Sequence, residues 1–219
     1  MQLRYGKLMV SAIAALAVAG AYASWTITID ENTGNVFVPP STPLKTAARV
    51  QAFTNPQPRV DIIPIQGNPY PIAAGGEYPY TAGNSAVVYT VSGSVPITGV
   101  FITTNGFVRG NATVAWSKTV VDLDTNIPIL NFAADYNGAV LGGSDGPIND
   151  VRFFDFSIPS SNFRVIDTIT VYADQAPSED DIALVYQFTQ EFVPVPEPAS
   201  MLALGVGLAG LVGLRRRKK

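Results

Sequence analysis

The chain has 219 residues, with 17 acidic and 14 basic side chains and neither histidine nor cysteine. The two missing residue types exclude disulfide bonds, zinc sites built from Cys or His, and catalysis by Ser-His-Asp, Cys-His or a histidine base. Stability must therefore come from a hydrophobic core, and roughly 170 residues are enough for one in a single domain.

Residues 1–23 have the pattern of a secretory signal peptide. Arg4 and Lys7 precede an apolar run over 8–20, and Ala21 and Ala23 stand three and one positions before a predicted cleavage ahead of Ser24. The apolar run is too short to span a bilayer comfortably. The sequence therefore predicts export and cleavage by signal peptidase, with an uncleaved N-terminal anchor as the alternative.

Residues 24–192 indicate β structure throughout, because apolar and polar residues alternate in short runs rich in Val, Ile, Thr and aromatic side chains. Residues 70–80 contain two prolines and two glycines and are expected to form a loop. Ser178–Asp181 allows a short helical turn before a last strand. Strands are expected over 25–29, 35–38, 47–53, 59–65, 86–91, 99–104, 112–123, 129–135, 151–158, 165–173 and 182–192. This spacing predicts an all-β fold, a single β-sandwich of jelly-roll or immunoglobulin-like topology.

Residues 193–219 contain three blocks in series. Pro196, Glu197 and Pro198 are followed by an uncharged run over 199–214, and a basic cluster closes the chain, consisting of Arg215, Arg216, Arg217, Lys218 and Lys219. As a helix the uncharged run would be roughly 24 Å long, and the adjoining Arg and Lys side chains can reach the headgroups to complete a span. The basic cluster holds its end in the cytoplasm, so Pro196-Glu197-Pro198 lies outside as a stiff, exposed strip.

These three blocks resemble the PEP-CTERM sorting signal. The resemblance implies processing by an exosortase, a membrane-embedded enzyme, in a bacterium that makes exopolysaccharide. It also implies transient anchoring in the inner membrane, followed by a place at the cell surface or outside the cell. The resemblance covers only the last 25 residues or so, and it implies nothing about the rest of the chain.

The exported region is distinctly acidic. Two basic residues lie in the signal peptide and five in the tail, which leaves seven against 17 acids and a net charge of −10. Such a surface repels nucleic acid and anionic lipid. We expect a non-enzymatic protein with a structural or interaction role in an exopolysaccharide or biofilm context. The alternatives are a lectin-like carbohydrate-binding module and, less favoured, a glycoside hydrolase acting through paired carboxylates.

Oxygen-bearing side chains cluster at two turns where calcium could bind, although no cofactor is otherwise expected. The first turn holds Asp122, Asp124 and Asn126, and the second holds Asp145 and Asp150. Ile127 stands where an EF-hand requires glycine, so an EF-hand is excluded and a plain polar turn is the alternative.

Five aromatic residues are candidates for stacking on sugars: Trp25, Tyr70, Tyr78, Tyr80 and Trp116. Trp116 lies in an alternating strand and is expected in the core instead. Asn111-Ala112-Thr113 matches a glycosylation sequon, but its neighbours favour an ordinary turn.

Overall fold

The computed structural model describes residues 23–35, 48–55, 57–64, 72–76, 82–137, 146–174 and 178–195. Two parts of the chain lie outside these ranges. They are most of the predicted signal peptide and the C-terminal segment with the Pro196–Pro198 strip, the predicted membrane helix over 199–214 and the basic cluster. Within them, no helix is long and apolar enough to cross a membrane. Residues Ser24–Pro194 form one compact unit.

The described residues form nine β-strands, all paired antiparallel, and no helix. The strands are β1 (Trp25–Asn35), β2 (Ala48–Phe53), β3 (Arg59–Pro64), β4 (Ile72–Gly76), β5 (Ala82–Arg109), β6 (Thr113–Asp122), β7 (Ile127–Asn137), β8 (Gly146–Tyr172) and β9 (Ser178–Pro194). The all-β prediction is therefore confirmed.

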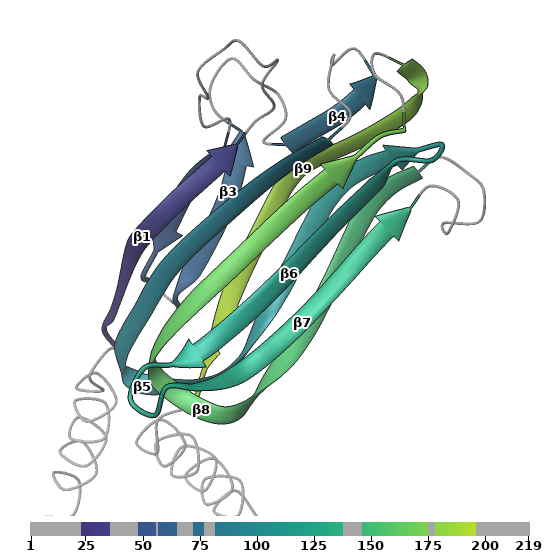
Figure 1. Cartoon of the computed structure of the whole chain (residues 1–219). Coiled ribbons are helices and arrows are strands. Elements are labelled where there is room, and N and C mark those ends of the chain that lie inside the picture. The colour runs from purple at the N-terminus through teal and green to yellow at the C-terminus, as the bar shows by residue number, and fades with distance from the viewer. Residues whose placement is uncertain are drawn as a thin grey trace, which may run out of the picture. The chain divides into compact units, whose positions relative to one another are not determined.

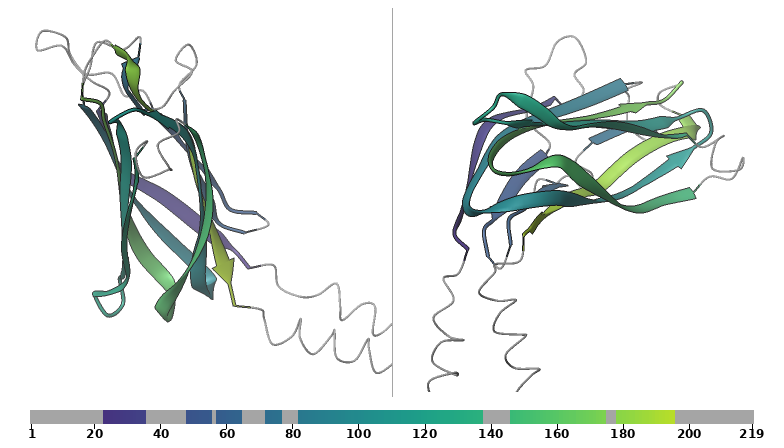
Figure 2. Two further views of the ribbon diagram at one scale, coloured as in Figure 1. Left: turned by 90° about the vertical axis from the view of Figure 1, so that its right-hand side faces the viewer. Right: turned by 90° about the horizontal axis from the view of Figure 1, so that it is seen from below.

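The strands lie in two facing layers, as expected for a β-sandwich (Figures 1 and 2). The first layer has the order β1, first half of β5, second half of β8, β6, β7. The second has the order β2, β3, β9, second half of β5, first half of β8, and β4 also pairs with β9. The first half of β8 therefore forms one edge of the second layer, beside β7 at the edge of the first.

Both long strands pass from one layer to the other at a corner. The pairing of β5 with β8 shifts register between Ser92 and Ile97, and Pro96 and Pro159 lie at the break. Proline has no N–H to donate, so it is tolerated where the ladder is interrupted. Buried positions on β5 are odd-numbered before the corner (Val87, Tyr89, Val91) and even-numbered from Val100 onward. This change of parity explains why separate strands were predicted over 86–91 and 99–104, and over 151–158 and 165–173, where the chain is continuous.

One further expectation, about the chain around β4, is wrong. The predicted loop over 70–80 contains β4, which pairs with β9. At Ser178–Asp181, where a short helical turn was left open, the chain is already in strand β9. Gly75 and Gly76 have φ of 70° and 59°, a conformation that glycine adopts without strain. A Cβ at Gly75 would lie 1.8 Å from the carbonyl oxygen of Asp181, so the strands approach this closely only with glycine there.

The core lies between the layers and is built around aromatic side chains. Trp116 on β6 is 3% exposed and contacts Phe188 of β9, with ring centroids 5.4 Å apart. Phe132 and Phe154 extend the cluster toward the edge, and Phe163 and Phe192 form a second contact between the layers. The expected core position of Trp116 is confirmed. Each such ring contributes about 1.5–3 kcal/mol through burial.

Candidate functional site: a polar cleft beside an exposed aromatic pair

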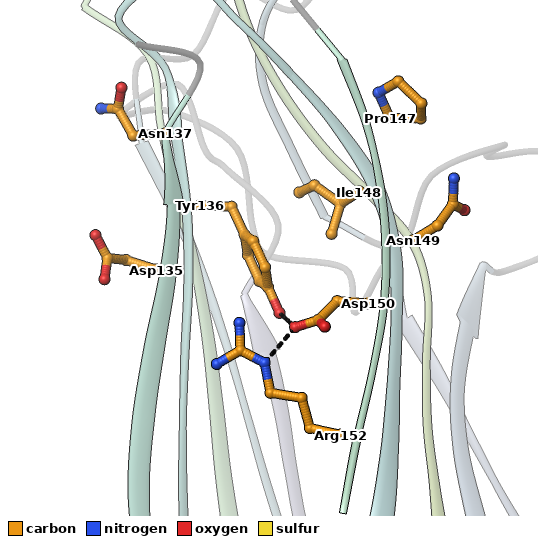
Figure 3. Close-up of a pocket in the computed structure, with 8 residues that line it drawn as sticks. All are labelled: Asp135, Tyr136, Asn137, Pro147, Ile148, Asn149, Asp150 and Arg152. Atoms are coloured by element: carbon orange, nitrogen blue, oxygen red, sulfur yellow. Dashed lines mark hydrogen bonds and ion pairs between the residues drawn. The ribbon is translucent and has the colours of Figure 1, made fainter. Parts of the chain in front are cut away.

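A cleft of about 390 Å³ opens where the edge strands of the two layers, β7 and β8, lie side by side (Figure 3). Its walls come from two short segments, Asp135–Asn137 of β7 and Pro147–Arg152 of β8. Tyr136, Ile148, Asp150 and Arg152 point into the space between the strands, and Asp135 and Asn137 point to the other side of β7. The alternation of side chains along each strand produces this division.

Three polar side chains in the cleft form one connected group. The Tyr136 hydroxyl donates to Asp150 Oδ2, and the same oxygen lies 2.5 Å from Arg152 Nε. Trp116 Nε1 donates to the Tyr136 oxygen at 3.4 Å, which links the cleft to the core. Burial, and then the hydrogen bond to Asp150, raise the pKa of Tyr136, so its hydroxyl stays a donor at neutral pH.

The cleft is suited to binding and poorly suited to hydrolysis by carboxylates. The side chains of Arg152 and Asp150 are 40% and 26% exposed, so their remaining N–H groups and oxygen can reach ligand hydroxyls. Glycoside hydrolysis requires two carboxylates flanking one bond. Asp135 and Asp150 lie on opposite sides of β7 (Figure 3), so they do not face a common space.

Next to the cleft, the outer face of the second layer carries an exposed aromatic pair. Phe101 of β5 and Phe153 of β8 are paired in register, are each 42% exposed, and have ring centroids 4.7 Å apart. A Cβ at Gly99 would lie 2.7 Å from Phe153 Cζ, so the phenyl ring lies over the glycine backbone. Val151, 64% exposed, adjoins them on β8. We call Phe101, Phe153 and Val151 the aromatic platform.

The sequence did not single out the platform, since Phe101 and Phe153 look like ordinary members of alternating strands. Only the change of parity at the corners turns them outward. Trp25, one of the candidates for stacking on sugars, is buried, so that role was wrong for it, and Trp116 is buried as expected. Trp25 packs on Gly93, where a Cβ would meet its ring at 2.0 Å. Tyr70, Tyr78 and Tyr80 lie outside the described residues.

The calcium candidates of the first turn, Asp122 and Asp124, accept hydrogen bonds from neighbouring side chains and backbone. Asp122 accepts hydrogen bonds from Ser160 Oγ at 2.5 Å and from Thr125 N and Oγ1 at 2.7 Å. Asp124 accepts from Asn162 Nδ2 at 2.9 Å, and Asn126 has φ of 58°. These contacts are those of a polar turn between β6 and β7.

Asp150 lies near the other end of β6, because its hydrogen-bond partner Tyr136 is paired in register with Val114. Asp145 is outside the described residues. The described residues contain no group of three or more metal-ligating Asp or Glu side chains. Asn111 also lies in a turn, where its N–H donates to Asp181 Oδ1 at 2.8 Å.

The C-terminal block matches a known sorting family over residues 194–218, described as the PEP-CTERM protein-sorting motif. Residues 194–218 are a PEP-CTERM motif. This confirms the resemblance carried by Pro196, Glu197 and Pro198 and the basic cluster. The motif implies that the chain is exported and sorted by an exosortase to the surface or the exterior. No curated protein matches the sequence significantly.

Solved structures similar to this chain include several carbohydrate-binding modules. The CBM36-1 domain of a multidomain xylanase from the hindgut metagenome of Trinervitermes trinervoides is 13% identical, with a TM-score of 0.27, over 76% of this chain and 95% of that domain. TmCBM61, solved with β-1,4-galactotriose, is 9% identical with a TM-score of 0.28, over 78% and 91%. At this level of similarity the comparison assigns no ligand.

Proposed function

We propose that this protein is an exported, non-enzymatic component of the cell surface or extracellular matrix, and that its β-sandwich binds a neutral polysaccharide. The observation that carries the proposal is the position of the aromatic platform and the polar cleft on one exposed edge strand, β8. Along this strand Val151 and Phe153 face outward and Arg152 faces the cleft, so a chain lying along the edge can contact both.

Each part of this edge suits a different part of a sugar. The apolar C–H face of a pyranose packs on exposed aromatic rings, and the rings of Phe101 and Phe153 provide such a surface. Sugar hydroxyls require directed donors and acceptors, which Arg152 and Asp150 supply. The net charge of −10 for the exported region disfavours anionic polysaccharides. A neutral glycan therefore fits best.

The binding test uses the mature protein and a panel of neutral polysaccharides, including β-glucan, xylan, mannan and galactan, in affinity electrophoresis and calorimetry. Phe153→Ala should weaken binding about tenfold, which corresponds to roughly 1.4 kcal/mol, and Arg152→Ala should also weaken it. Phe53→Ala is the matched control. Phe53 is 40% exposed, similar to Phe153, but its ring is covered by the Arg59 guanidinium at 4.8 Å.

Unchanged affinity in Phe153→Ala and Arg152→Ala would reject this site, even if the protein binds a glycan elsewhere. Absence of binding to every polysaccharide in the panel would reject a neutral-glycan ligand. Weakening by Phe53→Ala equal to that by Phe153→Ala would place the ligand across the whole sheet face instead of at the β8 edge.

We further propose how the termini are processed. Signal peptidase cuts between Ala23 and Ser24, the helix over 199–214 holds the chain in the inner membrane, and the basic cluster over 215–219 stays in the cytoplasm. The exosortase then acts near Pro196-Glu197-Pro198, and the tail is lost. Mass spectrometry of both mature ends, in cells with and without exosortase, tests this. Retention of residues 215–219 in exosortase-containing cells would contradict it.

A further inference from the structure

The core contains a polar group that the proposed binding function does not use. It consists of Tyr89 on β5, Lys118 on β6, Asp167 on β8 and Gln190 on β9, and we call it the buried quartet. All four residues are 0% exposed. Tyr89, Lys118 and Asp167 belong to the first layer, where Lys118 and Asp167 are paired in register, and Gln190 belongs to the second.

The contacts within the buried quartet place an amine, a carboxamide and a carboxylate in mutual reach. Lys118 Nζ lies 2.6 Å from Asp167 Oδ1 and contacts Gln190 Oε1, the oxygen bonded to the carboxamide carbon Cδ. Gln190 Nε2 donates to the second oxygen, Asp167 Oδ2, at 2.6 Å. Tyr89 donates its hydroxyl proton to Gln190 Oε1 at 2.5 Å.

We propose that the buried quartet forms an intramolecular isopeptide bond between Lys118 Nζ and Gln190 Cδ, with release of ammonia. Asp167 first takes a proton from the Lys118 ammonium through Oδ1. The neutral amine attacks Cδ, a C–N bond forms, and the carbonyl electrons move onto Oε1. As the carbonyl re-forms, the Cδ–Nε2 bond breaks, and Nε2 leaves with protons from the attacking nitrogen and from Asp167. Overall, the ammonium and the carboxamide become a secondary amide and an ammonium ion, and Asp167 ends as a carboxylate.

Each residue of the buried quartet has the property that its step requires. Burial lowers the pKa of Lys118 against the opposing effect of Asp167, which favours the neutral amine. Burial raises the pKa of Tyr89 well above its usual range, so it keeps the proton that stabilises the developing oxyanion. The two Asp167 oxygens separately contact the attacking and the leaving nitrogen, so one carboxylate can move both protons.

The surroundings of the buried quartet favour formation of the isopeptide bond. Groups held in contact react as if at very high concentration, and the absence of solvent exposure at all four residues keeps out the water that would compete as nucleophile. Phe192 of β9 packs against Tyr89, with ring centroids 6.3 Å apart, and Phe163 of β8 packs against Phe192. Apolar walls make separate charges on Lys118 and Asp167 unfavourable, and an amide removes the lysine charge.

The bond would join the two layers covalently in a protein that has no cysteine. It would attach β9 to β6, and β9 ends at Pro194, where the PEP-CTERM motif begins. The crosslink would therefore secure the strand that connects the sandwich to the sorting segment. The inference does not depend on glycan binding, and its test does not involve a glycan.

The test is intact-mass and peptide-mapping mass spectrometry of the purified, fully denatured chain, with its two ends determined in the same run. The expected mass is lower than that of the sequence by one molecule of ammonia, and digestion yields a branched peptide that joins Lys118 to Gln190. Full sequence mass, with Lys118 and Gln190 in separate linear peptides, would overturn the proposal. This measurement needs no variant, so it remains decisive if a substitution prevents folding.

Variants of the buried quartet test the role of each residue in forming the bond. Lys118→Arg and Asp167→Asn should keep the full sequence mass, and Tyr89→Phe should form the crosslink more slowly after refolding. Gln187→Ala is the matched control, since Gln187 lies on β9 but donates to Thr189 outside the quartet, and it should retain the ammonia deficit. Loss of water with a branched Lys118–Asp167 peptide would overturn Gln190 as the acceptor, and crosslinking in Asp167→Asn would overturn the role of Asp167.

Discussion

Truncation of Phe188 is the sharpest test of how the two layers pack. Phe188 is 1% exposed, and its ring contacts that of Trp116 across the layers at 5.4 Å and 61°. Phe188→Ala leaves a cavity in the core. The side chains around this cavity are held in place by the pairing of their own strands, so the cavity cannot close fully. We expect a loss of about 3–5 kcal/mol in the free energy of unfolding. For a domain of this size, that lowers Tm by roughly 6–20 °C.

The assay is equilibrium unfolding in urea, followed by tryptophan fluorescence. The chain has two tryptophans, and Trp116 lies against the altered site. Phe153→Ala is the matched control because it removes the same side chain from the exposed face, where we expect a loss of no more than about 1 kcal/mol. The slope of unfolding free energy against urea should not differ between the two variants, since both expose the same surface on unfolding.

Two results would refute this reasoning. A loss below about 1 kcal/mol in Phe188→Ala would mean that the layers do not meet at Trp116 and Phe188. Equal losses in Phe188→Ala and Phe153→Ala would mean that the inner and outer faces of the second layer have been assigned wrongly.

Three further predictions concern the turns that contain Asp122 and Gly110. Hydrogen bonds from Ser160, and then from Thr125, lower the pKa of Asp122 below its unfolded value; its stabilisation is therefore present at neutral pH and lost as the pH falls below about 4. Asp122→Asn should accordingly show a smaller fall in Tm between pH 7 and pH 3, and an unchanged fall would contradict this assignment. Because the Asp122 carboxylate already accepts three hydrogen bonds within the protein, calcium or EDTA should leave Tm unchanged, and a rise with calcium would show an ion site. Gly110→Ala should destabilise by about 1–3 kcal/mol in urea unfolding, since φ is 62° and a Cβ would lie 2.2 Å from the Asp180 carbonyl oxygen; wild-type stability would exclude that backbone geometry.

The features that the sequence predicted correctly are those encoded by neighbouring residues. Alternation and β-branched composition indicated the strands, and Trp116 was expected in the core because it lies at an apolar position of an alternating run. The sorting motif depends on residues close together in the chain, so no fold was needed to recognise it. The absence of histidine and cysteine excluded whole classes of chemistry without any structural information.

The tertiary structure decided what depends on register between distant segments. Lys118 and Gln190 are 72 positions apart, and nothing near either residue indicates that they touch. Phe101 and Phe153 face outward only because the corners in β5 and β8 reverse which alternate positions are buried. A strand's own sequence specifies two faces, but pairing and layer packing choose which face is covered, and that choice produced both the buried quartet and the exposed aromatic platform.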